Sequence, residues 1–438
     1  MKTKKGVEIG LSVILILSLT FGILGYAKAQ PQKLSYKIGV NGSLTGVYAA
    51  VSGPFTEGIK IRVNAINKQG GINGHPLELT IVDDGGDPNK AVLATKNMIT
   101  VGNIHVLNPG VMTAITQAII PIVTDEKCPA VGGAGSGVVD RPPKHWYFRP
   151  AMNDLEQLLY AVGIFNKLGV KKTAIIYSSS AFGKGMMVIA PLWLKDSGFQ
   201  ITAVESYNPT DTDMTPQLSK IAMSNPDALT ILGSELGGGL VVKQAREMGL
   251  KYPMWLTNAL FNPDIVKVVR QYYDMESGTY TAMDRPVVSD LLPADSPDAA
   301  AGKEFVSLYN QSDYGKKQGS PIPSTLVGGY RSMQVLEDAL KRSKADPDPT
   351  KLTETRAAIR GALEQTKDLV VSGGKFTMSP NDHCGSRPGT VLAPVAFKNG
   401  NFVVMVDVAA KMYDSPPPKW WYPSEWETPT KPKEPGVR

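Results

Sequence analysis

The chain has 438 residues, of which 42% are apolar and 20% are charged. This length is too great for one small domain, and the composition is that of a globular protein able to bury a sizeable core. The formal net charge of +6 is too small to indicate a nucleic-acid surface, so no nucleic-acid partner is predicted.

Residues 1–29 have the three parts of a secretion signal. Lysines near the start precede an apolar stretch from Leu11 to Leu24, and Ala27 and Ala29 form a small-residue cleavage site before Gln30. An uncleaved membrane anchor is the alternative, but the apolar stretch is shorter than the roughly 20 residues that cross a bilayer. No cysteine lies near the cleavage site, so no lipid anchor is expected. We predict an exported, periplasmic protein that is soluble after cleavage.

The first predicted structural unit follows this signal. Alternating apolar residues predict a strand at 36–40, and a glycine-containing loop at 41–46 leads to a helix at 54–67 with Pro54 in its first turn. A second strand is predicted at 77–82. Strand, helix and strand form a βαβ unit, which indicates a parallel sheet covered by helices.

The same alternation continues along the chain and predicts a doubly wound α/β fold. An extended crossing at 145–150 separates two lobes, further crossings are expected near 280–285 and 370–376, and a hairpin is expected at 390–406. The other predicted helices are 88–101, one starting near Thr113, 155–168, 182–197, 215–225, 237–248 and 327–343, and the other strands are 104–107, 130–131, 172–177, 201–207, 228–232 and 254–256.

Four segments of this pattern carry a family resemblance. SLTG, the run 53–58, INKQGGINGHPLEL and VDDGGDPNKA resemble the Leu/Ile/Val-binding group of periplasmic solute-binding proteins, which serve ABC importers. The resemblance covers most of the chain after the signal and ends near Asp407. It implies the type I periplasmic binding fold, in which two doubly wound parallel-sheet lobes are joined by a three-strand hinge. The expected bounds are 33–150 and 282–371 for lobe 1, and 151–281 and 372–408 for lobe 2.

The residues from 409 to 438 lie outside that resemblance. They are rich in proline and tryptophan and have no helical or strand period, which predicts an extended C-terminal tail. A strap on the protein's own surface and a partner-binding element are both compatible with this composition.

Motifs for covalent chemistry are missing from the sequence. It contains no nucleophile elbow, no phosphate-binding loop ending in GK[ST] and no HExxH, and its four histidines lack metal-ligand spacing. Neither an enzyme nor a bound metal or cofactor is predicted. Cys128 and Cys384 could form a disulfide in an oxidising compartment, but two separate buried thiols are favoured.

Candidate binding residues on lobe 1 follow from the resemblance. Thr113 matches a family serine that starts a helix and binds the ligand carboxylate, and a plain helix N-cap is the alternative role. The loop Gly133, Ala134, Gly135 and Ser136 matches a second contact to the ligand's carboxylate and amine. Tyr48 and Ser52 belong to the first binding loop.

On lobe 2 the resemblance identifies four further candidates. Phe182 replaces a family tyrosine that closes over the ligand, and Ser234 stands where an aromatic residue is frequent, with Glu235 beside it. Asn258 stands where amino-acid binders carry an acid that pairs with the ligand's ammonium group. An ammonium buried without a counter-charge costs several kcal/mol, so either Glu235 supplies the charge or the ligand is not an α-amino acid.

The sequence therefore predicts a monomeric solute-binding protein that closes by a hinge around a small solute and delivers it to the membrane permease of an ABC importer. A branched-chain amino acid is the expected ligand. A small carboxylic acid, including an aromatic one, or an amide is the alternative within this class. A ligand-sensing module for a membrane receptor is a different reading of the same site.

Overall fold

The computed structural model describes residues 33–408, apart from 153, 274–277, 293–297, 320, 387–388 and 406–407. The predicted signal and tail therefore lie outside the described residues. The described part contains two large sheets and a two-stranded hairpin, β11 (Leu369–Val371) with β12 (Gly374–Phe376).

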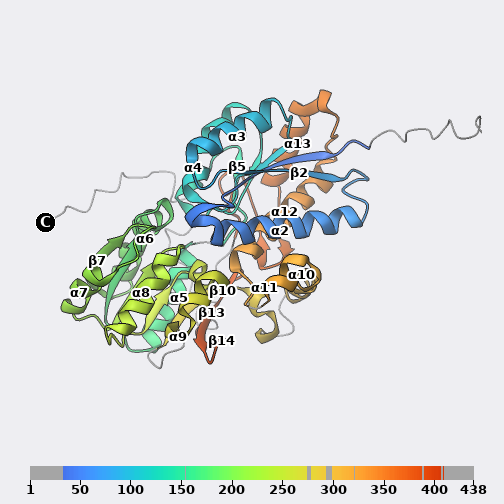
Figure 1. The fold of residues 1–438 in the computed structure, drawn as a ribbon. Helices are drawn as coiled ribbons and strands as arrows, with labels where there is room; N and C mark the ends of the chain where they lie inside the picture. The colour runs from blue at the N-terminus through green and yellow to red at the C-terminus, as the bar shows by residue number, and fades with distance from the viewer. Residues whose placement is uncertain are drawn as a thin grey trace, which may run out of the picture. The chain divides into compact units, whose positions relative to one another are not determined.

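The first sheet has five parallel strands in the order β2-β1-β3-β4-β5. Helices α3 and α4 cover one face, and α2 and α12 cover the other (Figure 1). Alternate residues of β1 explain this arrangement, because Tyr36, Ile38 and Val40 enter the core beneath α2 while Gly39 lies against Met98 of α3. The strands are β1 (Tyr36–Gly42), β2 (Leu77–Asp83), β3 (Val106–Asn108), β4 (Ala130–Val131) and β5 (Tyr147–Phe148), and the helices are η1 (Gly46–Tyr48), α2 (Ala49–Lys68), α3 (Pro88–Thr100), α4 (Thr113–Asp125), η2 (Gly137–Val139), α12 (Ser324–Ser343), η5 (Pro349–Lys351) and α13 (Leu352–Glu364).

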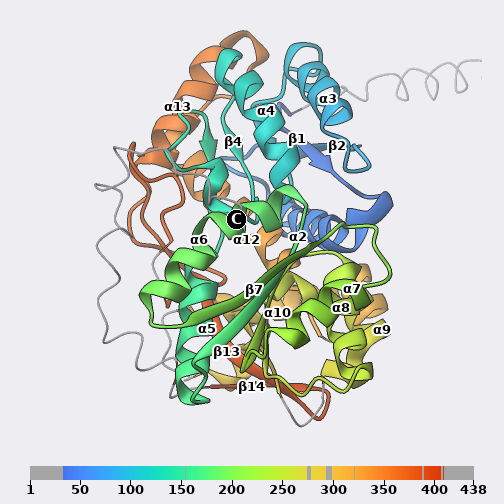
Figure 2. The same cartoon turned by 90° about the vertical axis from the view of Figure 1, so that its left-hand side faces the viewer.

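The second sheet has seven strands in the order β14-β13-β10-β9-β8-β6-β7. Strands β6 to β10 are parallel, whereas β13 pairs antiparallel with β10 and with β14. Helices α8 and α9 pack side by side on this sheet (Figure 2). The strands are β6 (Lys172–Ser178), β7 (Gln200–Tyr207), β8 (Ala228–Leu232), β9 (Met254–Leu256), β10 (Thr279–Asp284), β13 (Leu392–Lys398) and β14 (Asn401–Val404), and the remaining helices are α5 (Asp154–Lys167), α6 (Ala181–Asp196), α7 (Thr215–Met223), α8 (Leu236–Glu247), η3 (Asn258–Phe261), α9 (Pro263–Tyr273), η4 (Arg285–Leu291), α10 (Ala299–Gln311) and α11 (Asp313–Gln318).

Burial on both faces explains the apolar runs in the central strands of the second sheet. Leu229 and Ile231 of β8 join the core under α7, α8 and α9, whereas Ala228 and Leu232 face the core of α5 and α6. A parallel sheet covered on both sides needs this continuous hydrophobic pattern. The predicted α/β class with doubly wound parallel sheets is confirmed.

Several local predictions need correction. The prediction that Pro54 lies in the first turn of its helix is wrong, because α2 begins at Ala49 and contains Pro54 internally. The crossings at 145–150 and 280–285 stay predictions, and these extended segments contain β5 and β10, which pair within the first and the second sheet respectively. Helices α9, α10 and α13 lie outside the predicted elements, while the hairpin expected at 390–406 is present as β13 and β14.

The cysteines and the helices bear on two further predictions. Cys128 and Cys384 are both buried free thiols, which confirms the favoured reading. None of the helices in the described ranges is long and apolar enough to cross a membrane. Within the same ranges, no cluster of His, Cys, Asp or Glu side chains is arranged to hold a metal ion.

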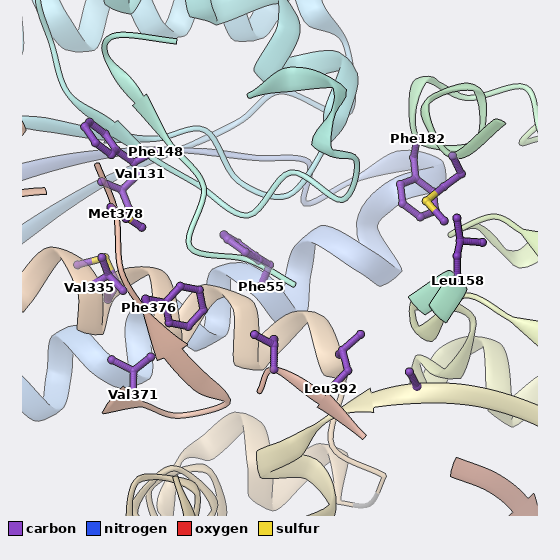
Figure 3. Close-up of a cluster of buried hydrophobic side chains, with 14 of the residues drawn as sticks. Phe55, Val131, Phe148, Leu158, Phe182, Val335, Val371, Phe376, Met378 and Leu392 are labelled. Carbon is purple, nitrogen blue, oxygen red and sulfur yellow. The ribbon is translucent and has the colours of Figure 1, made fainter. Parts of the chain in front are cut away.

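Helices α2 and α12 touch through their backbones. A Cβ atom at Gly58 would lie 2.0 Å from the carbonyl oxygen of Leu326, and one at Gly329 would lie 1.9 Å from that of Phe55. Only glycine allows such an approach. Figure 3 shows Phe55 and Val335 from these helices in one buried hydrophobic cluster with Phe182 and Leu158, so a single core includes residues packed on both sheets.

A buried acid lies where the chain enters β13 of the second sheet. Glu156 of α5 accepts hydrogen bonds through Oε1 from the backbone N–H groups of Gly389 and Leu392, at 2.9 and 3.1 Å. Its Oε2 has no partner among the described residues. Burial raises the pKa of Glu156 to about 8, against the partial opposition of these backbone hydrogen bonds.

Gly329→Ala should destabilise the protein by about 1–3 kcal/mol, because the added methyl group meets the α2 backbone and forces the helices apart. Urea unfolding measures this change. The matched control is Gly361→Ala in α13, where a Cβ meets no atom within 4 Å. The control should be neutral or more stable by up to about 1 kcal/mol. Equal effects of the two substitutions would refute the close helix contact.

Glu156→Gln should change how stability depends on pH. The folded state holds the Glu156 proton more tightly than the unfolded chain, so wild-type stability falls as pH rises from 4.5 towards about 8. The variant lacks this titration. Its free energy of unfolding should therefore rise relative to that of the wild type by up to about 1.4 kcal/mol per pH unit in that window. Urea unfolding across the window measures the difference. Glu247→Gln is the control, because the fully exposed Glu247 has a lowered pKa and does not titrate there. Parallel pH profiles for wild type and Glu156→Gln would contradict the prediction.

Candidate functional site

The two sheets share one strand order. If the parallel strands of each sheet are numbered 1 to 5 in chain order, both sheets have the spatial order 2-1-3-4-5. The direction in which successive strands are added therefore reverses between β1 and β3 in the first sheet and between β6 and β8 in the second. Open α/β sheets bind ligands at the carboxyl ends of strands beside such a reversal. The predicted residues occupy these positions, since Tyr48 follows β1, Thr113 follows β3, Phe182 follows β6, and Ser234 and Glu235 follow β8.

Thr113 and Ser136 are brought together although they are 23 positions apart. Thr113 is the first residue of α4, and Met112 is the N-cap, so the alternative role of Thr113 as a plain N-cap is wrong. The Thr113 hydroxyl oxygen accepts a hydrogen bond from the Ser136 backbone N–H at 3.4 Å. The hydroxyl can still donate its own proton, and it lies at a helix N-terminus, where a negative charge is favoured.

The loop from Gly133 to Ser136 is held by the preceding loop of the same sheet. The N–H groups of Gly133 and Gly135 donate to the carbonyls of Gly110 and Val111, at 3.0 and 3.2 Å. The carbonyl of Ala134 accepts from Arg149, and the Ser136 hydroxyl donates to Asp154 at 3.4 Å. Most polar groups of this loop therefore have partners within the protein.

Arg149 and Asp154 support this loop and were not among the predicted site residues. Arg149 is fully buried and pairs with Asp140 at 2.9 Å. Asp154 accepts from the Gly137 N–H at 2.9 Å and faces Arg141 at 3.3 Å. The arginine in HWYFRP is the sequence signal for this network, because an arginine inside an apolar extended segment requires buried partners.

Helix α6 of the second sheet lies directly against the same loop. A Cβ at Gly135 would be 2.8 Å from the Phe182 ring, and a Cβ at Gly185 would be 2.3 Å from the Ser136 hydroxyl oxygen. Phe182 is buried, with 6% of its surface exposed. Phe182 is thus placed over the loop that was predicted to hold the ligand.

The prediction that Tyr48 and Ser52 belong to a loop is wrong, because Tyr48 ends η1 and Ser52 lies in the first turn of α2. The Ser52 hydroxyl is buried and accepts from the Ser43 N–H at 3.0 Å, which fixes the chain after β1. Tyr48 is half-buried with its ring against Gly86. Burial raises the pKa of Tyr48, and the negative charge of Glu235 raises it further. Glu235, which follows strand β8 of the second sheet, is therefore close enough to Tyr48, which follows strand β1 of the first sheet, to affect its pKa.

Glu235 is a buried acid that lies at the N-terminus of α8 and has no paired cation among the described residues. Its side chain is at the start of α8, and the residue is 2% exposed. Oε2 accepts from the Ser234 N–H at 3.2 Å, but Oε1 has no hydrogen-bond partner among the described residues. Burial and the charge of Glu235 together raise the pKa of the neighbouring Tyr207 phenol well above its ordinary value. A buried carboxylate in this state favours a cation brought from outside.

Asn258 bonds neighbouring side chains through its two nitrogens, whereas its buried Oδ1 has no hydrogen-bond partner among the described residues. Its amide nitrogen donates to the Ser324 hydroxyl at 3.2 Å, and its backbone N–H donates to the side-chain Oε1 of Gln157 at 3.0 Å. The Ser324 hydroxyl donates in turn to Asp284, whose other oxygen accepts from Arg331 at 2.6 Å. This places Asn258 in a network that joins α5, η3 and α12.

Asp284, Ser324 and Arg331 were not predicted. Asp284 could have been found as an acid that ends a buried strand, at the edge where the other candidates lie. Ser324 and Arg331 could not, because only the docking of α12 brings them to this position. The pairing with Arg331 neutralises Asp284 inside the protein.

Comparison with known proteins gives consistent matches over this whole region. The profile of the periplasmic binding protein family matches residues 35–400. A Leu/Ile/Val-binding protein homolog 3 of Brucella melitensis is 23% identical over 372 residues, covering 83% of this chain and 92% of that protein. A leucine-, isoleucine-, valine-, threonine- and alanine-binding protein of Pseudomonas aeruginosa is 21% identical over 344 residues, covering 78% of this chain and 87% of that protein.

Solved structures agree in fold. An extracellular ligand-binding receptor from Rhodopseudomonas palustris superposes with a TM-score of 0.75 at 25% identity, covering 84% of this chain and 99% of that one. A leucine-binding protein from Thermotoga maritima gives a TM-score of 0.71 at 21% identity, with 84% and 97% covered.

Proposed function

This chain belongs to the periplasmic binding protein family, and from that membership we propose that it is the exported solute-binding protein of an ABC importer. The family consists of solute-binding proteins and not of enzymes. In our proposal, residues 1–29 direct export, the mature protein captures a small solute between its two lobes, and the loaded protein delivers the solute to a membrane permease.

The proposed ligand is an α-amino acid of the branched-chain type. The observation that carries this proposal is the buried Glu235 carboxylate, which has one oxygen without a partner among the described residues. An ammonium group would supply the missing charge and donor together. Relatives named for leucine, isoleucine and valine binding support the same ligand class.

The carboxylate of the amino acid is assigned to the first lobe. The Thr113 hydroxyl is buried, lies at the start of α4 and retains a proton to donate. The Ser136 hydroxyl is directed to Asp154, so it fixes the loop and leaves Thr113 as the main hydroxyl donor to the ligand. Tyr48 and Phe182 are the proposed walls around the ligand.

A second candidate ligand follows from Asn258. This residue is neutral where amino-acid binders carry an acid, and its amide is already bonded to Ser324. A deaminated carboxylic acid or an amide would need no acid at that position. The same site would also suit a sensor that reports to a membrane receptor, and adjacent genes for a permease and an ATPase would favour transport.

Thr113→Val should weaken leucine binding by about 1–3 kcal/mol, because the ligand carboxylate loses a buried donor. Isothermal titration calorimetry measures this difference. Thr124→Val is the control, since Thr124 is exposed at the other end of α4 and its hydroxyl bonds only to Ile120 of the same helix among the described residues. Unchanged leucine affinity in Thr113→Val would remove this residue from the site.

Glu235→Gln should abolish most of the thermal stabilisation by leucine or valine, because bonds to a charged group contribute about 1.5–3 kcal/mol. A thermal-shift screen would compare these amino acids with their deaminated analogues and small amides, since a bound ligand raises Tm by mass action. Glu247→Gln, an exposed acid at the far end of α8, serves as the control. Stabilisation of the wild type by the deaminated acids alone would reject the amino acid and favour the second candidate.

A further inference from the structure

Helix α2 contains a carbonyl group that its own helix cannot satisfy in the usual way. Proline has no backbone N–H, so Pro54 cannot donate to the carbonyl oxygen four residues earlier, that of Ala50. Ala50 lies two residues after Tyr48, beside the first binding loop. The carbonyl is thus left available near the candidate site.

A side chain from the second sheet bonds this carbonyl. The amide nitrogen of Asn262 donates to the Ala50 carbonyl oxygen, across 212 positions of the chain. Asn262 is 3% exposed and lies between η3, which follows β9, and α9. Its Oδ1 accepts from the Asp264 N–H at 3.1 Å, so the same amide also caps α9.

We propose that Asn262 and the Ala50 carbonyl form a latch between the two lobes, and that Pro54 keeps the carbonyl free for it. The latch lies beside the candidate site, because Ala50 adjoins the loop of Tyr48 and Asn262 follows the η3 turn that Asn258 begins. Asn262 is a positioning residue, which favours the arrangement of lobes in which Thr113 and Glu235 face one solute. This inference rests on the proposed capture of a solute between the lobes, since an interaction that favours the capturing arrangement raises solute affinity.

Two substitutions test the latch from its two sides. Asn262→Asp keeps an oxygen to cap α9 and removes the amide donor. Pro54→Ala supplies an N–H that bonds the Ala50 carbonyl within α2 and so competes with Asn262. Each should weaken leucine affinity by about fivefold to tenfold, the effect of one lost hydrogen bond. The double variant should be no weaker than either single variant, because both changes remove the same interaction.

Matched controls separate the latch from general effects of these changes. Asn401→Asp introduces the same charge at an exposed position of β14, and Pro191→Ala removes a proline from inside α6. Both should leave leucine affinity within about twofold of the wild type, as expected for sites outside the latch. Calorimetry gives the affinities of all variants.

Small-angle scattering without ligand distinguishes failure of the latch from failure of the proposed function. If the wild type binds leucine, unchanged affinity in both Asn262→Asp and Pro54→Ala overturns the latch while the proposed function stands. If leucine does not bind, the radius of gyration decides. A larger radius in both variants than in the wild type and the controls supports the latch, and equal radii overturn it.

Discussion

The direct backbone contact between α2 and α12 is the constraint on which the rest of the structure depends. Gly58 and Gly329 let the two helices approach to a distance that any side chain would prevent. The contact joins α2 to a helix far along the chain, and Arg62 reinforces it by pairing with Glu337, 275 positions away. Its consequence reaches the site, because α12 begins at Ser324, whose hydroxyl meets both Asn258 and Asp284. The packing of α12 on α2 therefore determines where the polar network of Asn258, Ser324 and Asp284 forms.

The repeated strand order gives the molecule two equivalent edges. Each sheet reverses its order beside its first strand, so each presents loops at the carboxyl ends of neighbouring strands. Phe182 lies against Gly135, and Gly185 lies against Ser136. Helix α6, which follows strand β6 of the second sheet, therefore contacts the loop after strand β4 of the first sheet. The proposed binding site, assembled from both edges, needs only such loops, and its candidate residues are accordingly spread from Tyr48 to Asn258.

The sequence predicts elements that are specified by their own residues, and it misses features that depend on contacts between segments far apart in the chain. Strands 228–232 and 254–256 have the predicted bounds, because continuous apolar runs between turns are enough to specify buried parallel strands. The sequence predicts Pro54 in the first turn of a helix, where proline is frequent, whereas α2 begins at Ala49 and Asn262, distant in the chain, bonds the Ala50 carbonyl. Among the candidate residues, Thr113 and Ser136 are identified by the family resemblance, while Arg331 reaches the same region only through the docking of α12. Helix α9 had a visible signal, the helical spacing of Ile265, Val266, Val269 and Tyr273.

Which residue can pair with a ligand ammonium group depends on which buried acid lacks a cation in the folded protein, and not only on where the family places an acid in the sequence. Asn258 lacks the acid expected at its position, and its amide is bonded within the protein. Asp284 is an acid at a neighbouring strand end, but Arg331 already balances it. Glu235 is as deeply buried as these residues and has no cation paired with it in the described part of the chain. A solute without a positive group would leave that carboxylate buried and uncompensated, at a cost of several kcal/mol, whereas an amino acid removes the cost on binding. This charge balance is the physical argument for the proposed amino-acid ligand, whose ammonium group would pair with Glu235 although the expected acid at position 258 is missing.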